Sequence, residues 1–275
     1  MEILVSDTNP IKISILLPTR GRTDLLKRSL LSLVKNVSDV DSMEILLAFD
    51  NDDIKSYEFF QENIAPELDQ HGCAYTAMGF ERLGYIRLNE YLNALAKHAR
   101  GDWVFFWGDD AVMKSADWDL RITEVEKFRI LRIPTHNQHP YAVLPVIPRS
   151  WFELFGYISA HQLTDSWVSQ IAYLVDIMQN IDIDVLHDRF DITGNNLDET
   201  WKNRPMLEGR PSDPRDFNHP AWRQHRTRDA ARIAQYLRQQ GEDTTWWENV
   251  IQGRQDPWAK MMSPEYDPNK QVSRF

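Results

Sequence analysis

The chain has 275 residues, of which 42% are hydrophobic and 26% charged, a composition typical of a globular protein with one large α/β domain, with or without an appendage. The formal net charge of −10 disfavours an extended surface that tracks nucleic-acid phosphates. No apolar run approaches the roughly 18 residues of a membrane span, the N-terminus lacks signal-peptide features, and the single cysteine, Cys73, excludes an internal disulfide, so we expect a cytoplasmic protein with no membrane partner.

Strand and helix patterns alternate from residue 11 onward. Residues 11–17 alternate and then run apolar, as in a first sheet strand that stops at Pro18. Thr23 or Asp24 is placed to cap the helix that follows. Further strand patterns cover residues 43–49 and 73–78, and further helical patterns cover residues 57–68 and 88–98. This order predicts a mostly parallel sheet with helices on both faces.

A buried strand is expected at residues 103–107, an apolar and aromatic run that ends in Gly108, Asp109 and Asp110. In an open α/β sheet, ligands bind beyond the carboxyl ends of the strands, where paired carboxylates can share a divalent metal with a phosphate group. A surface turn with two solvated aspartates is the alternative interpretation of these residues.

Three strand ends carry complementary polar groups. Thr19 and Arg20 follow the first strand, residues 50–53 follow the second, and Asp109 with Asp110 follows the fourth. An arginine suits a base or a phosphate, a single acid suits a ribose hydroxyl, and an acid pair suits a metal-bound diphosphate. The sequence contains neither G-x-G-x-x-G nor G-x-x-x-x-G-K-[ST], the glycine-rich motifs that bind phosphates in Rossmann dinucleotide sites and in P-loops. It therefore supports neither kind of site.

Five ordered blocks carry a resemblance to a known family: residues 15–20 (ILLPTR), 44–50 (EILLAFD), Asn93, 101–103 (GDW) and 108–110 (GDD). Over about residues 11–198 the sequence resembles GT-A fold glycosyltransferases, closest to the inverting family-2 type. The resemblance implies an α/β, Rossmann-like, mostly parallel sheet flanked by helices. It also implies a nucleotide-diphosphate sugar donor, with UDP favoured because it is common in the family, and Mn²⁺ or Mg²⁺.

The resemblance also implies roles for individual residues. Asp110 would bind the metal, and the residues expected to contact the donor are Pro18, Thr19, Arg20, Asp50, Asp52, Arg87, Asn93 and Asp109. The sequence departs from the family in two places. Trp107 stands where the family usually has a further aspartate, and Leu92 stands where the family has the arginine of an Arg-Asn pair, so that Arg87 or Asn89 would have to substitute for it.

Two later residues complete the expected site. By resemblance, Asp165 is the general base that deprotonates the acceptor hydroxyl, at a helix N-terminus whose dipole favours the ionised carboxylate; a plain N-cap aspartate is the alternative. His187, after an expected strand over residues 181–186, is a candidate second metal ligand or an ordinary structural histidine. His136, His139 and His161 have weaker claims to the site.

The expected domain boundary separates a catalytic domain, residues 1–200, from a C-terminal extension, residues 201–275. The extension begins with a linker rich in proline and charge at residues 203–221, followed by a helix over residues 222–240. Five arginines of that helix either face an anionic acceptor or lie on a solvated face and pair with the acidic body. Its tryptophans are expected to attach the extension to the domain.

Three functions stay open at this point. A metal-dependent, inverting glycosyltransferase fits the ordered motifs and Asp165. A nucleotidyltransferase would need a lysine-bearing phosphate loop, and a non-catalytic protein that binds nucleotide sugars or glycans would explain Trp107 and Leu92. The acceptor can be a glycan, a protein side chain, a small molecule or a hydroxymethylated base in DNA, of the kind that some phage glycosyltransferases modify. Absence of a Q-x-x-R-W motif favours single addition over processive synthesis.

Overall fold

A computed structural model describes residues 10–134, 139–189, 193–194 and 212–259. Its main sheet has seven strands in the order β3-β2-β1-β4-β7-β6-β8, and a second sheet pairs β5 with β9. The strands are β1 (Ile13–Thr19), β2 (Met43–Asp50), β3 (Ala74–Phe80), β4 (Trp103–Phe106), β5 (Ala111–Met113), β6 (Ile130–Arg132), β7 (Val146–Pro148), β8 (Met178–Asn180) and β9 (Val185–His187).

Parallel pairing dominates the half of the sheet that carries the sequence motifs. β1 pairs in parallel with β2 and β4, and β2 with β3, so these four strands end at one edge. β7 is antiparallel to both β4 and β6, while β8 is parallel to β6. The mostly parallel α/β sheet predicted from the sequence is therefore confirmed.

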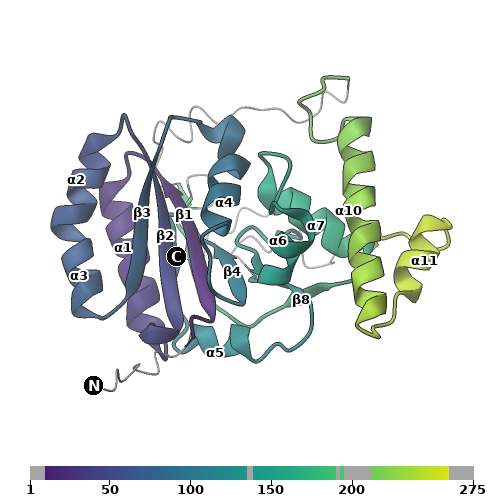
Figure 1. Ribbon diagram of the computed structural model, residues 1–275, viewed down its shortest axis with the longest axis horizontal. Helices are drawn as coiled ribbons and strands as arrows, with labels where there is room; N and C mark the ends of the chain where they lie inside the picture. The colour runs from purple at the N-terminus through teal and green to yellow at the C-terminus, as the bar shows by residue number, and fades with distance from the viewer. Residues whose placement is uncertain (1–9, 135–138, 190–192, 195–211, 260–275) are drawn as a thin grey trace, which may run out of the picture.

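Helices cover both faces of the main sheet (Figure 1). They are α1 (Thr23–Asn36), α2 (Ile54–Asn63), α3 (Ala65–Gln70), α4 (Leu88–Ala96), α5 (Trp118–Thr123), α6 (Arg149–Phe155), α7 (Thr164–Leu174), α10 (Pro220–Gln239) and α11 (Thr245–Ile251), with short 3₁₀ turns η1 (Val40–Ser42) and η2 (Tyr85–Arg87). No helix among the described residues is long and apolar enough to cross a membrane.

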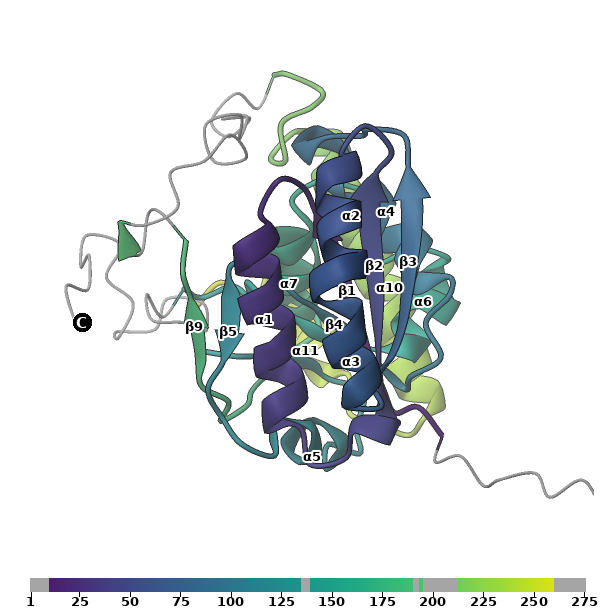
Figure 2. The same ribbon diagram turned by 90° about the vertical axis from the view of Figure 1, so that its left-hand side faces the viewer.

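Strand alternation divides the core into two clusters. Side chains at odd positions of β1, such as Ile13 and Ile15, face α1, α2 and α3, whereas Leu16 belongs to the cluster of α4, α6, α7 and α10. Figure 1 shows these two groups of helices on opposite sides of the sheet. Figure 2 shows the β5 and β9 pair beside α1, at the edge of the same body.

The C-terminal elements share the second core cluster. Ile233 and Leu237 of α10 and Trp247 of α11 are buried together with Trp167 of α7. The ring of Trp222 packs edge-on against His161 and Trp167, and Trp246 donates its indole N–H to the carbonyl oxygen of Tyr173. These tryptophans pack α10 and α11 against α7. The predicted boundary at residues 200 and 201, and residues 203–211 of the predicted linker, lie outside the described residues.

Two details of the N-terminal prediction are wrong. β1 does not stop at Pro18 but continues to Thr19. The pairing of β4 with β1 ends at Leu16, so the missing N–H of Pro18 interrupts no hydrogen bond between these strands. Neither Thr23 nor Asp24 caps α1; Arg22 occupies the N-cap position and makes no side-chain capping bond.

Two predicted elements are also divided differently. The helix expected over residues 57–68 is interrupted between Asn63 and Ala65, because Pro66 occupies the first turn of α3 and cannot continue the preceding helix. The strand expected over residues 181–186 is wrong: the N–H of Ile183 donates to the carbonyl of Ile181 in a tight turn, and β9 begins only at Val185. The buried side chains of Ile181 and Ile183 explain the misleading apolar pattern.

Candidate functional site

The ends of β1 and β2 and the turn after β4 meet at one edge of the sheet. Thr19 Oγ1 donates to Asp109 Oδ2 at 2.9 Å, and Arg20 Nη1 donates to Asp50 Oδ2 at 2.9 Å. Pro18 directly precedes this edge inside β1. The structure thus brings together the three strand ends that the sequence singled out. We call the following set the rim cluster: Thr19, Arg20, Arg22, Asp50, Asp52, Asp109, Asp110 and His187.

Arg20 connects the first two strand ends. Its guanidinium contacts Asp50 and also Asp52, with Nη2 at 3.0 Å from Asp52 Oδ2. These bonds, chiefly the one with Asp52, raise the pKa of Arg20, and the guanidinium in turn lowers the pKa of Asp52. Asp50 is buried and also accepts a hydrogen bond from the hydroxyl of Tyr91. Tyr91 was not predicted; a buried tyrosine in α4 gave no signal that distinguishes it from core.

Arg22 is the second residue that the sequence analysis missed. Its Nη1 lies 2.7 Å from Asp109 Oδ1 and 3.3 Å from Asp110 Oδ2, so one guanidinium faces both carboxylates of the acidic turn. Arg22 stands between β1 and α1, in the loop that holds Arg20. A second basic residue in that loop was the available signal.

His187 approaches Asp110 through the small sheet. β5 and β9 are antiparallel with Ala111 opposite His187, which places His187 Nε2 at 3.3 Å from Asp110 Oδ1. The ring is buried, and its Nδ1 has no hydrogen-bond partner among the described residues. A carboxylate oxygen and an imidazole nitrogen from two neighbouring strands are thus close enough to bind one divalent ion.

The two acidic side chains of the turn titrate in opposite directions. Burial raises the pKa of Asp109 to about 6, against the opposing charge of Arg22, while the charge of Asp110 adds to the increase. At Asp110, burial is outweighed by the hydrogen bond from His187 and by the positive charges of Arg22 and Arg189, which lower the pKa to about 2. Asp110 therefore stays ionised far into the acidic range, whereas Asp109 takes up a proton near pH 6.

Gly108 and Trp107 set the shape of the turn. A Cβ on Gly108 would lie 2.8 Å from Asp110 Oδ1, so the glycine leaves room for that carboxylate. Trp107 points into the core, where its indole N–H donates to Ser29 Oγ at 2.7 Å, and Ser29 Oγ donates to the carbonyl of Gly108 at 2.8 Å. The position that carries an aspartate in the family is therefore structural here and supplies no metal ligand.

Arg87 and Asn93 lie on or beside α4, and no contact with the rim cluster is seen for them among the described residues. Arg87 is exposed and forms an ion pair with Glu90. Asn93 Oδ1 accepts from the N–H of Ile158 at 2.7 Å, and its Nδ2 donates to the carbonyl of Ser159 at 2.9 Å. Leu92 is buried in the core, and Asn89 also donates to Ser159.

Asp165 lies in the first turn of α7. Leu163 occupies the N-cap position, so the alternative of a simple N-cap aspartate is wrong. The Asp165 carboxylate accepts from the N–H of Ser166 at 2.7 Å and remains partly exposed.

The other candidate histidines have structural contacts. His161 is buried and bonded to backbone at both ring nitrogens, and His139 Nδ1 accepts from the N–H of Tyr141, which supports structural roles for both. His136 lies outside the described residues.

No protein-family model and no curated protein matches the sequence. Solved structures do match the fold. The mannosyltransferase PcManGT from Pyrobaculum calidifontis, in complex with GDP-Man and Mn²⁺, aligns with 94% of this chain and 73% of its own, at 14% identity and a TM-score of 0.55. Residues 1–349 of S. aureus TarS, in complex with UDP, align with 65% of this chain at 16% identity and a TM-score of 0.50.

These similarities establish the fold. Both neighbours are GT-A-type glycosyltransferases, and the chain has the GT-A fold. The TarS alignment spans 59% of that chain, so the present chain corresponds to only part of it. Among residues 10–134, 139–189, 193–194 and 212–259, no group of three or more histidine, cysteine, aspartate and glutamate side chains forms a metal site.

Proposed function

We propose that this GT-A chain is a metal-dependent glycosyltransferase that moves a sugar from a nucleotide-diphosphate donor to an acceptor hydroxyl with inversion. The observation that carries the proposal is the rim cluster. Its four carboxylates outnumber the three guanidinium groups that form ion pairs with them, those of Arg20, Arg22 and Arg82, so the edge of the sheet where α/β proteins bind ligands favours an added cation.

The donor would bind across the strand ends. We propose Pro18, Thr19, Arg20, Asp50 and Asp52 as contacts of the base and ribose, and Asp109 would face the ribose. UDP is the favoured nucleotide, with GDP as the alternative to test. We also propose that Arg87 contacts the nucleotide-sugar donor. Asn93 is proposed to act mainly by positioning the segment at Ile158 and Ser159, because both ends of its amide bind there.

Asp110 and His187 would hold the divalent cation, Mn²⁺ or Mg²⁺. Their pairing at 3.3 Å would supply one hard carboxylate oxygen and one imidazole nitrogen to a divalent ion. When bound, the ion would neutralise the diphosphate that leaves with the nucleotide.

Asp165 is proposed as the general base. Its carboxylate would take the proton of the acceptor hydroxyl as that oxygen forms a bond to the anomeric carbon, while the bond from that carbon to the diphosphate oxygen breaks on the opposite face. The bonding electrons leave with the nucleoside diphosphate. Asp165 lies in the first turn of the 11-residue helix α7 and is partly exposed.

One observation favours a second candidate, a non-catalytic protein that binds nucleotide sugars. Arg22 already faces Asp109 and Asp110, and Trp107 supplies no acid, so the turn is partly neutralised without a metal. The nucleotidyltransferase alternative gains no such support, because the loop after β1 carries arginines and no lysine. The acceptor classes named from the sequence stay open.

A binding experiment separates the two candidates. Melting temperatures would be measured with UDP-sugars and GDP-sugars, with and without Mn²⁺, for the wild type, Asp110→Asn and His187→Ala. A ligand that binds the folded state alone raises the melting temperature. Asp182→Asn is the matched control, because this carboxylate is exposed and lies five residues before His187.

The transferase proposal expects a nucleotide-dependent shift that needs Mn²⁺ and is lost in both site variants but kept in the control. A shift that needs no metal and survives Asp110→Asn would support the binding protein instead. Absence of a shift with every nucleotide sugar would overturn both candidates.

A further inference from the structure

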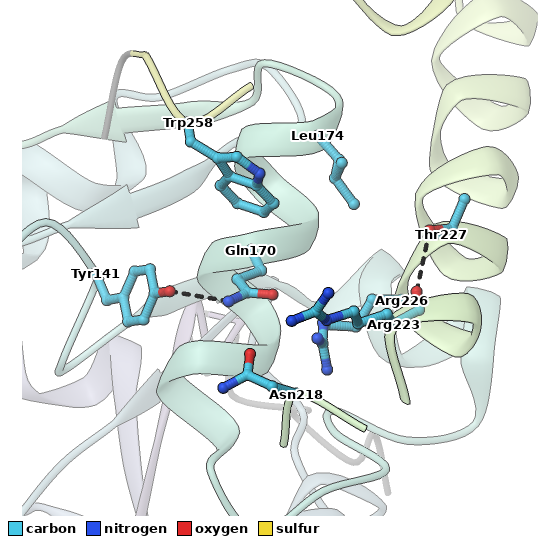
Figure 3. A pocket seen from close by; sticks show the side chains of 8 residues that line it. All are labelled: Tyr141, Gln170, Leu174, Asn218, Arg223, Arg226, Thr227 and Trp258. Carbon is cyan, nitrogen blue, oxygen red and sulfur yellow. Dashed lines mark hydrogen bonds between the residues drawn. The ribbon is translucent and has the colours of Figure 1, made fainter. Parts of the chain in front are cut away.

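A cavity of about 390 Å³ lies between α7 and α10, apart from the rim cluster. Figure 3 shows the side chains of Arg223, Arg226, Gln170 and Asn218 directed toward the same space, with the ring of Trp258 opposite the arginines. The volume is within the range of small-molecule sites, roughly 300 to 1,000 Å³. None of the lining residues belongs to the proposed donor site.

Arg226 is the unusual residue of this cavity. The whole residue is only 3% exposed. Its Nη1 donates to the carbonyl of Phe217 at 3.0 Å, and its guanidinium lies over the Phe217 ring, 3.9 Å from the centroid. Among the described residues no carboxylate forms an ion pair with Arg226. A buried cation without an ionic partner is unfavourable, and an anion in the cavity would relieve it.

A second positive charge lines the same space. Arg223 precedes Arg226 by one helical turn, and no carboxylate within the described part of the chain forms an ion pair with it. Burial, with a contribution from Arg223, lowers the pKa of Arg226 to about 10, so this guanidinium remains charged at neutral pH. Two adjacent guanidinium groups match a doubly charged oxyanion such as a phosphate monoester better than a single carboxylate.

The remaining groups that line the cavity are suited to bind the organic part of a phosphate monoester. Gln170 donates to the hydroxyl of Tyr141 at 2.9 Å, which leaves its carbonyl oxygen facing the cavity. The Asn218 side chain makes no hydrogen bond to any described residue. Trp258 and Tyr141 offer aromatic faces on which the apolar face of a sugar ring, or a flat ring, can pack.

We propose that the cavity between α7 and α10 binds a small phosphate monoester that carries a ring, with Arg226 and Arg223 on the phosphate and Trp258 on the ring. The cavity volume of about 390 Å³ and the net charge of −10 favour a small molecule over a nucleic-acid strand. Binding in this cavity does not require donor binding at the rim cluster, so the two proposals can be tested independently.

Calorimetric titrations at fixed ionic strength would use glucose 6-phosphate, glycerol 3-phosphate and a 12-base-pair DNA duplex. The first two ligands carry the same charge and differ in the ring. Arg223→Ala is the main variant, because Arg223 is exposed and its loss should not impair folding. Arg228→Ala, an exposed arginine of the same helix outside the cavity, is the matched control, and Arg226→Gln is the second test.

We expect glucose 6-phosphate to bind about tenfold more tightly than glycerol 3-phosphate, because the apolar face of its ring would pack on Trp258. Trp258→Ala should remove this preference. Arg223→Ala should weaken both ligands about tenfold, whereas Arg228→Ala and Arg20→Ala, the latter in the rim cluster, should change them less than twofold.

Three outcomes would overturn the proposal: no binding of either monoester, equal losses in Arg223→Ala and Arg228→Ala, or tighter binding of the duplex than of glucose 6-phosphate. A loss in Arg20→Ala alone would place the phosphate at the rim cluster and would also overturn it.

Discussion

Two groups of charged side chains in this protein are neutralised in different ways. In the rim cluster every arginine faces carboxylates, and the acids are in excess. In the cavity between α7 and α10, Arg226 and Arg223 face each other with no carboxylate partner among the described residues. A site with excess acid suits a ligand that arrives with a metal ion, whereas an uncompensated pair of arginines suits an anion.

Arg22→Met should have the largest effect on stability, because it removes the guanidinium that compensates two buried carboxylates. Breaking a buried ion pair from one side typically costs about 3 to 5 kcal/mol. Urea unfolding at pH 7 would measure the loss. Arg228→Met is the control and should change the free energy of unfolding by less than about 0.5 kcal/mol.

Adding Asp109→Asn to Arg22→Met should restore part of the loss, because it removes one of the carboxylates left without a partner. Equal stability of Arg22→Met and Arg228→Met would show that the rim cluster is not held together by this arginine, and the contrast with the cavity would then disappear.

Asp109 should produce the next largest effect, visible as a dependence of stability on pH. Its pKa rises from 3.8 to about 6 on folding, so between these values the folded protein keeps a proton that the unfolded chain has lost. The free energy of unfolding should therefore fall as the pH rises from about 4 to about 6, by at most about 3 kcal/mol at 1.36 kcal/mol per pKa unit. The depressed pKa of Asp110 acts in the opposite direction and only below about pH 4.

Urea unfolding at a series of pH values would measure this slope. Asp109→Asn should flatten the curve between pH 4 and 6, and Asp182→Asn should leave the curve unchanged. A slope that persists in Asp109→Asn would assign the titration to another group.

Arg226→Met should have the smallest effect on stability. It loses a hydrogen bond to the Phe217 carbonyl and the contact with the Phe217 ring, but it also removes a buried charge that has no ionic partner. These contributions oppose each other, so the free energy of unfolding should change by less than about 1 kcal/mol in either direction. A loss as large as that of Arg22→Met in the same urea assay would show that Arg226 is compensated within the protein.

The N-terminal half of the fold could largely be predicted from sequence. Strong strand patterns and the polar groups after each strand predicted that Arg20, Asp50 and Asp109 would meet, and the structure brings them together. The later elements were harder to predict, because β5 to β9 are only three residues long and such short segments carry almost no periodic signal. Residues 181–184 are an example of a wrong prediction, because two buried isoleucines in a tight turn gave the apolar pattern of a strand.

The sequence by itself determined the fold class and the polar edge of the sheet, because alternation along strands and chain order are local properties of the chain. Only the tertiary structure decided which charges meet. Arg22 reaches Asp109 across 87 positions and Arg226 is left without a carboxylate partner among the described residues, and both follow from how α1, α7 and α10 pack rather than from any local pattern. Burial then determines how strongly each contact affects stability, because a charge removed from water is stabilised only by the groups that packing places around it.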